Sequence, residues 1–180
     1  MASIIKNRAV TDDAWQVVRA AEDGALPAVG TLPAGKVLVP FALWQAERAA
    51  LVAAKTKDEL GVWLAPDSEP ADLVADFGAI ALIAVDFPRF ADGRGYSIAR
   101  LLRERHGWTG ELRAIGDVLR DQLNYMERCG FDAFAVRADK DIHDALNAFG
   151  EFSQRYQGAV DNPSPLFRRR AAAAAAKVDA

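Results

Sequence analysis

The chain has 180 residues and a mass of 19.5 kDa, a length that favours one medium domain with a short tail over two independent domains. Hydrophobic residues make up 51% and charged residues 26%, which is the composition of a folded globular protein and excludes global disorder. The 22 basic side chains are outnumbered by 25 acidic ones, and the resulting net charge of −3 argues against a nucleic acid or an anionic membrane as partner.

The sequence also restricts the cellular compartment that we expect and the redox chemistry that the protein can carry out by itself. Its amino terminus lacks the apolar core of a signal peptide, and no apolar run is long enough to span a bilayer, so we expect a cytoplasmic protein. The single cysteine excludes an intramolecular disulfide, an all-cysteine zinc site and a self-contained iron–sulfur cluster.

The first 35 residues predict a β-hairpin and a loop packed on the main domain. The apolar runs Ile4-Ile5 and Trp15–Val18 are separated by the turn-rich segment Thr11–Asp13, which is typical of a hairpin. The segment Arg19–Gly35 is rich in Gly, Pro and Ala, so it predicts a connecting loop.

From Lys36 onward, short β-prone runs alternate with longer amphipathic segments, and this alternation predicts an α/β domain over residues 36–158. The expected strands are Val37–Val39, Gly61–Leu64, Leu82–Val85, Leu112–Ile115 and Ala133–Val136. The expected helices are Ala42–Lys55, Pro70–Phe77, Tyr96–His106, Leu119–Cys129 and Ile142–Arg155. Nearly continuous apolar strands favour a mainly parallel sheet of about five βα units flanked by helices. We expect an open sheet rather than part of a barrel, because a full barrel needs eight units.

The end of the chain, residues 159–180, differs in composition from the rest. Asp161–Pro165 breaks regular structure, and the basic run Arg168–Arg170 precedes the homopolymer Ala171–Ala176. This composition predicts a mobile tail, with a docking arm for an acidic surface as the alternative.

Polar residues follow three of the expected strands, and ligands of parallel sheets bind at the carboxyl ends of strands. The glycine loop after the third strand leads into a helix, so its N–H groups and Arg94 are candidates for holding an anion. Its residues are Asp92, Gly93, Arg94, Gly95, Tyr96 and Ser97. The alternative is a tight turn in which Asp92 or Ser97 caps the helix. Ile98 stands where a dinucleotide-binding loop has a third Gly or Ala, so no Rossmann motif is present.

Carboxylates at the same strand ends are the catalytic candidates. Asp86 directly follows an apolar strand and is the expected base, and Asp117 is the second candidate, although helix capping also explains Asp117. Clustered carboxylates can hold magnesium, but their spacing does not place them together, so we assign no metal site. The remaining candidates for binding substrate or partner are Arg89, Arg120, Asp121 and Gln122.

The single cysteine and the two histidines are weaker candidates for a nucleophile or a metal ligand. Cys129 lies late in an expected helix, where the helix dipole disfavours a thiolate, so we expect a buried structural thiol. His106 and His143 lack paired ligand spacing, which argues against a zinc site and against a Ser-His-Asp triad.

Three segments together resemble a known bacterial family of unknown function. They are Asp86–Arg105, Gly110–Gln122 and Arg128–Phe134, and the resemblance extends over Met1 to about Arg155. Members of that family are labelled as oxidoreductases associated with assimilatory sulfite reductase. The resemblance implies a place beside the sulfite reductase haemoprotein in sulfate assimilation, and it implies no known reaction or catalytic residues. No flavin, nicotinamide, haem or iron–sulfur motif occurs in the sequence, so the cofactor is unknown and any siroheme or cluster would belong to the partner.

Two functions therefore remain as expectations, and whether the protein is an enzyme stays open. The first is an accessory protein of assimilatory sulfite reduction that contacts the haemoprotein through the Asp86–Ser97 loop, with Arg89, Arg94 and Arg120 toward an acidic partner. The second is a small α/β enzyme that binds an anionic sulfur oxyanion or phosphate compound at the strand ends. A scaffold without any small ligand is the third possibility, and the oligomeric state is not indicated.

Overall fold

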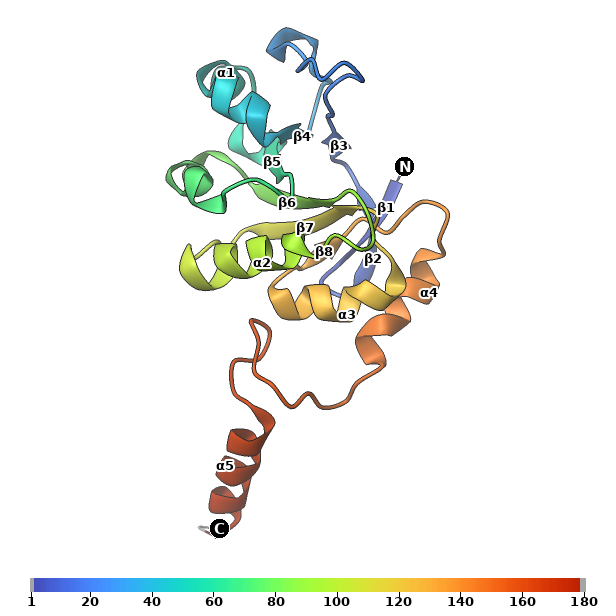
Figure 1. Cartoon of the computed structure of the whole chain (residues 1–180), viewed down its shortest axis with the longest axis vertical. Helices are drawn as coiled ribbons and strands as arrows, with labels where there is room; N and C mark the ends of the chain where they lie inside the picture. The colour runs from blue at the N-terminus through green and yellow to red at the C-terminus, as the bar shows by residue number, and fades with distance from the viewer. Residues whose placement is uncertain (1, 179–180) are drawn as a thin grey trace.

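The computed structural model describes residues 2–178, which form a mixed eight-stranded sheet with helices packed against it (Figure 1). The strands are β1 (Ala2–Lys6), β2 (Ala9–Asp13), β3 (Gln16–Val17), β4 (Val37–Pro40), β5 (Leu60–Leu64), β6 (Leu82–Phe87), β7 (Glu111–Gly116) and β8 (Ala133–Phe134). Their order in the sheet is β2-β1-β8-β7-β6-β5-β4-β3. Neighbours from β3 to β8 are parallel, whereas β1 is antiparallel to both β2 and β8. The expected mainly parallel sheet is therefore corrected to a mixed one.

The five expected strands are confirmed as β4 to β8, and the expected hairpin is confirmed with a different turn. The chain reverses at Asn7 and Arg8, whose φ angles are 49° and 61°. Two residues with positive φ match the twist of adjacent strands and make a tight hairpin turn. Thr11–Asp13, expected as the turn, lies within β2, and Trp15–Val18 belongs to the opposite edge of the sheet around β3. Arg8 gives no signal for this turn, because non-glycine residues rarely adopt positive φ.

The sheet is strongly curled. Asp13 ends β2 and Gln16 begins β3, so only two residues connect strands that lie at opposite edges of the sheet. Within the described residues no ladder joins β2 to β3, so the curl is not closed into a barrel. The inner face of the curl holds a small apolar cluster of Leu38, Leu82, Ala84 and Ile115, against which Trp15, Trp63 and Ala135 pack.

The helices cover the outer face of the sheet, where the large core lies. They are α1 (Phe41–Ala54), the 3-10 segment η3 (Pro70–Ala79), α2 (Arg94–Arg100), the π-helical turn η4 (Leu101–Arg105), α3 (Arg120–Cys129), α4 (Ile142–Leu146), the 3-10 turn η5 (Asn147–Gly150) and α5 (Leu166–Val178). Short 3-10 turns η1 (Val29–Thr31) and η2 (Lys57–Glu59) lie in the connections. Strand side chains alternate between the two faces, so Val85 and Phe87 of β6 face the helices while Ala84 and Asp86 face the inside of the curl.

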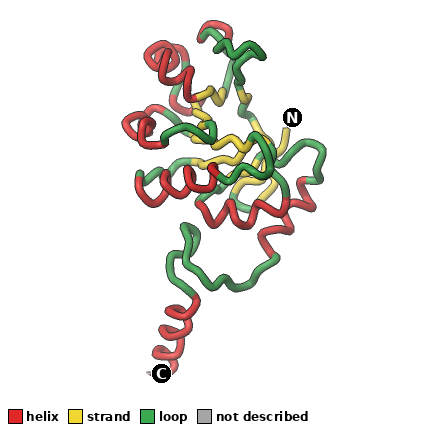
Figure 2. Tube along the Cα trace, in the orientation of Figure 1, coloured by secondary structure: helices red, strands yellow, loops and turns green. Residues whose placement is uncertain are grey.

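The expected helices are present with shifted ends. The segment expected as Pro70–Phe77 is 3-10 rather than α-helical, and the last one ends at Gly150 instead of Arg155. Beyond it, an irregular segment leads to α5, which protrudes from the rest of the molecule (Figures 1 and 2). Val160 N–H donates to the Arg128 carbonyl at 3.1 Å, so the irregular segment contacts the end of α3. The mobility expected for residues 159–180 stays a prediction. Among residues 2–178, no helix has the length and apolar character needed to cross a membrane.

Candidate functional site

Arg19 and Asp86 form an ion pair at the carboxyl ends of the strands, inside the curl. Asp86 is only 7% exposed, and the Arg19 guanidinium donates to its Oδ1 at 2.8 Å and its Oδ2 at 3.3 Å. The same guanidinium lies 5.1 Å from the ring centre of Trp63, whose Nε1 donates to the Val18 carbonyl. Two hydrogen bonds and a cation–π contact therefore fix Arg19 beside Asp86.

Gly116 brings a second carboxylate to the same place. It ends β7 with φ of 94°, and a Cβ there would lie 2.4 Å from the Phe87 carbonyl oxygen, so only glycine fits the close approach of the two strands. The next residue, Asp117, accepts from Arg137 Nη1 at 2.7 Å through Oδ1 and from the Phe90 N–H at 2.9 Å through Oδ2. Asp117 thus holds both the Arg137 side chain and the backbone of the loop after β6.

Arg137 joins Asp117 to Asp139. Its Nε and Nη2 donate to the two carboxylate oxygens of Asp139 at 2.6 Å and 3.0 Å. These bonds lower the pKa of Asp139 to about 2 and raise the pKa of Arg137. Both carboxylates therefore act as ion-pair partners of one guanidinium.

The two ion pairs line one open depression of about 470 Å³, which we name the strand-end cleft. Its lining residues are Arg19, Asp86, Phe87, Pro88, Gly116, Asp117 and Arg137. The side chains of Arg19 and Arg137 line this cleft and are 48% and 41% exposed. Since arginine already engages Asp86 and Asp117, the cleft offers cationic N–H donors more readily than a free carboxylate base.

The glycine loop lies outside the strand-end cleft. Asp92 accepts hydrogen bonds from the Arg94 N–H, Nε and Nη2 at 3.2, 3.0 and 2.7 Å, which lowers the pKa of Asp92 and raises that of Arg94. The Arg94 N–H bond makes a turn just before α2, but the N-cap of α2 is Gly93 and carries no side-chain cap bond, so neither Asp92 nor Ser97 caps the helix. Gly95 is buried against Phe87, because a Cβ on Gly95 would lie 2.7 Å from the ring. Gly95 therefore serves packing here.

The Tyr96 ring makes edge contacts with Phe87 and with Tyr125, at centroid distances of 5.2 and 5.1 Å. Burial raises the pKa of Tyr96. Tyr96 and the exposed Ser97 line a separate groove beside α3, together with Tyr125 and Arg128. Neither of these two predicted site residues lines the strand-end cleft.

The three predicted residues of α3 have different surroundings. Arg120 donates to Asp144 at 2.7 Å and to Glu151 at 3.0 Å, so it bridges toward α4 and η5, and these carboxylates raise its pKa. Asp121 is exposed. Gln122 is buried, accepts from the Leu119 N–H at 2.8 Å and donates to the Phe90 carbonyl at 3.4 Å.

Asp117 and Gln122 together hold the main chain of Phe90 on both sides while the Phe90 side chain stays 49% exposed. Its neighbour Arg89 is also exposed. The loop after β6 therefore presents an aromatic side chain on a fixed backbone. Phe90 was not among the predicted site residues, because a hydrophobic residue in a loop is more often an internal anchor than part of an apolar patch for a partner.

The structure thus brings together Asp86 and Asp117 among the predicted residues, and it adds Arg19 and Arg137, which the prediction left out of the site. Arg137 follows the last parallel strand, so its position was a usable signal. Arg19 was placed in a connecting loop, and nothing in the sequence indicates that the edge strand β3 delivers it to β6. In the described part of the chain, no three His, Cys, Asp or Glu side chains are grouped as metal ligands would be.

A protein-family model matches the chain over more than half of its length. Residues 61–167 match the family described as "Bacterial protein of unknown function (DUF934)", a stretch that holds β5 to β8, the cleft residues Asp86 and Asp117 and the Phe90 loop. No curated protein and no solved structure matches the chain. Because the match covers more than half of the sequence, the chain belongs to this bacterial family of unknown function.

Proposed function

We propose that the protein is an accessory protein of assimilatory sulfite reduction that docks onto the sulfite reductase haemoprotein through the loop Asp86–Ser97. The observation that carries the proposal is Phe90, whose backbone is held by Asp117 and Gln122 while its ring is 49% exposed. The resemblance of Asp86–Arg105 to the sulfite-reductase-associated family supports the choice of partner.

The physical argument rests on preorganisation. Exposed aromatic and arginine side chains contribute most of the binding energy at protein interfaces, and a loop fixed before binding loses little entropy on docking. Arg89 and Arg94, both exposed, stand in the same loop as Phe90. An aromatic anchor between two arginines fits a partner surface with an apolar depression and an acidic rim.

The geometry of the strand ends favours an interaction protein over an enzyme. Asp86 and Asp117 are engaged by Arg19 and Arg137, and Arg94 is bonded to Asp92 outside the cleft. An enzyme would need these three candidates to converge around one reacting centre. Carboxylates that already pair with arginines, in an open cleft that Arg94 does not reach, fit recognition better than bond chemistry.

Co-purification tests the proposal. Tagged wild-type protein, Phe90→Ala and Phe152→Ala would be used as baits in extract from sulfate-limited cells, and the haemoprotein would be quantified by its siroheme absorbance and by immunoblot. Phe152 is 59% exposed and lies outside the loop, so its variant is a matched control. We expect recovery with wild type and Phe152→Ala and a loss of about tenfold or more with Phe90→Ala. No recovery with any bait, or equal recovery with all three, contradicts the proposal.

A second candidate function is favoured by Arg19 and Arg137, whose part-exposed side chains line the strand-end cleft. Here the protein would be a small α/β enzyme or receptor for a sulfur oxyanion or phosphate compound. Calorimetric titration with sulfite and phosphate tests it, using Arg137→Gln against the control Arg94→Gln, which changes the same charge outside the cleft. Binding that Arg137→Gln abolishes supports this candidate, and binding that it leaves unchanged excludes the cleft.

A further inference from the structure

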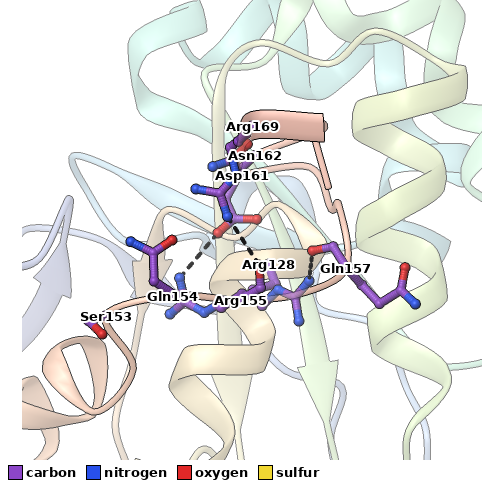
Figure 3. A pocket seen from close by; sticks show the side chains of 8 residues that line it. All are labelled: Arg128, Ser153, Gln154, Arg155, Gln157, Asp161, Asn162 and Arg169. Carbon is purple, nitrogen blue, oxygen red and sulfur yellow. Dashed lines mark hydrogen bonds and ion pairs between the residues drawn. The ribbon is translucent and has the colours of Figure 1, made fainter. Parts of the chain in front are cut away.

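Three arginines converge on a small cavity between α3, the irregular segment after η5 and the first turn of α5. Arg128 comes from the end of α3, Arg155 from the irregular segment and Arg169 from α5 (Figure 3). The cavity has a volume of about 80 Å³, and its other lining residues are Ser153, Gln154, Gln157, Asp161 and Asn162. We name it the arginine pocket. It shares no residue with the strand-end cleft.

Each guanidinium is only partly satisfied by the protein. Arg128 Nη2 donates to the Gln157 carbonyl at 2.7 Å, and Arg169 Nη2 donates to the Arg155 carbonyl at 3.1 Å. Arg155 Nη1 reaches Asp161 Oδ2 at 3.5 Å, a long contact. Asp161 is the one carboxylate that lines the pocket, so three positive charges face a single negative one.

The remaining donors of the same three side chains are buried without an acceptor. They are the Nε of Arg128, the Nε and Nη2 of Arg155 and the Nε of Arg169. Among the described residues these are the buried side-chain nitrogen and oxygen atoms that lack a hydrogen-bond partner. Leaving charged donors buried and unpaired is costly, so native proteins almost always supply an acceptor. In this pocket the protein supplies too few acceptors for the donors of the three arginines.

We propose that the arginine pocket binds a tetrahedral oxyanion, namely a sulfate or phosphate group. Such a group carries the negative charge that balances the excess of arginine, and it presents several oxygen acceptors in a volume that suits so small a cavity. Guanidinium groups bind these oxyanions through paired N–H donors, which is why arginine is preferred at phosphate sites. This inference goes beyond the proposed function, because it needs neither the Phe90 loop nor the haemoprotein.

A larger groove next to the pocket has room for the remainder of an ester. This groove, about 530 Å³, shares Arg128 and Gln157 with the arginine pocket and is also lined by Tyr96 and Tyr125. The oxyanion therefore has two sources, a free inorganic ion or the terminal group of a larger ligand whose ring contacts the tyrosines. The same oxyanion would tie α5 to α3, since Arg169 and Arg128 would share it.

Calorimetric titration of the full chain tests the proposal, with inorganic sulfate, inorganic phosphate and adenosine monophosphate as probes in a low-salt chloride buffer. The variant Arg169→Gln removes one pocket guanidinium, and Arg168→Gln is its control. Arg168 is exposed, lies over the Phe167 ring and does not line the pocket. Its replacement by glutamine changes the net charge of the protein by the same amount as Arg169→Gln. We expect wild type and Arg168→Gln to bind and Arg169→Gln to lose about tenfold or more in affinity, as for a charged hydrogen bond.

Hydrogen exchange gives a second readout that does not depend on affinity alone. Phosphate should slow exchange of amides around Gly158–Val160 in wild type, where Val160 N–H contacts Arg128, and should not do so in Arg169→Gln. Tighter binding of the nucleotide than of phosphate assigns an ester that occupies the groove, and the reverse order assigns a free ion. No binding of any probe to wild type, or equal binding to Arg169→Gln, overturns the proposal. Neither result bears on docking to the haemoprotein, which the co-purification with Phe90→Ala tests separately.

Discussion

Arg113 of β7 donates from Nη1 to both carboxylate oxygens of Asp13 at 2.9 Å, across 100 residues of sequence and across the inside of the curled sheet. Its Nε and Nη2 also bond to Glu111, and Glu111 in turn accepts from Lys6 at 2.7 Å. The Arg113 side chain is only 2% exposed. This chain of ion pairs connects β2, β7 and β1 on the inner face and holds the curl in place.

Replacing Arg113 with methionine should destabilise the fold strongly. The substitution keeps an unbranched apolar stem but leaves Asp13 and Glu111, which are 9% and 11% exposed, without their main cation. Removing one partner of a buried ion pair costs about 3–5 kcal/mol in the free energy of unfolding. Urea denaturation followed by circular dichroism measures the change.

The matched control is Arg100→Met, which removes an exposed pair with Glu104 one helical turn away. Such pairs contribute about 0.5 kcal/mol or less, so this variant should resemble wild type. A similar loss in both variants would show that Arg113 contributes no more than a surface charge, and the account of the curl would be wrong.

Gly95→Ala should destabilise the protein by about 1–3 kcal/mol, because the added Cβ overpacks against the Phe87 ring. Gly93→Ala is the paired control, since its nearest side-chain atom lies 3.7 Å away and it should stay within about 0.5 kcal/mol of wild type. Thermal unfolding of both variants checks this contrast. Equal stability would mean that Gly95 is not required for packing.

The sequence predicted the repeating part of the fold well and the edges poorly. Apolar runs such as Leu82–Val85 identify buried strands wherever they pack, so β4 to β8 were found by pattern alone. The joining of β1 to β8 depends on long-range pairing, which no local pattern encodes, and the turn at Asn7-Arg8 lacks the glycine that usually marks such a turn. A hairpin signal therefore indicated the element but not which residues would turn.

The candidate site shows the same division. Asp86 and Asp117 follow strands that the sequence revealed, so their neighbourhood could be predicted from the topology of parallel sheets. Arg19 reaches Asp86 only because the sheet curls and β3 becomes its far edge. Asp117 and Gln122 hold the backbone of Phe90 while its side chain is exposed, an arrangement of distant residues that sequence spacing cannot show.

The pair between Asp139 and Arg137 should make stability depend on acid pH. Arg137 lowers the pKa of Asp139 from an ordinary value of 3.8 to about 2 in the folded protein, so the unfolded state binds more protons in this range. The contribution is therefore present above pH of about 4 and is lost as pH falls through about 2. Unfolding curves should separate wild type from Asp139→Asn at neutral pH and converge near pH 2. A constant separation throughout would contradict the assignment.

Cys129 should react slowly with alkylating reagents, as expected for a buried structural thiol. It is 7% exposed, and burial raises the pKa of its thiol above the ordinary 9.0, which lowers the fraction of reactive thiolate at neutral pH. Iodoacetamide labelling followed by mass spectrometry should proceed more slowly than with free cysteine at pH 7.5 and accelerate above pH of about 9. Labelling as fast as the free thiol would refute the burial.

The most direct test of the docking proposal is hydrogen–deuterium exchange of the purified protein with and without the purified sulfite reductase haemoprotein. Phe90 and its neighbours from Arg89 to Arg94 should become protected on complex formation, while α1, on the far part of the sheet near β4 and β5, should not change. Phe90→Ala should lose this protection. Unchanged exchange in the loop at haemoprotein concentrations that saturate binding, or protection confined to other elements, would contradict the account.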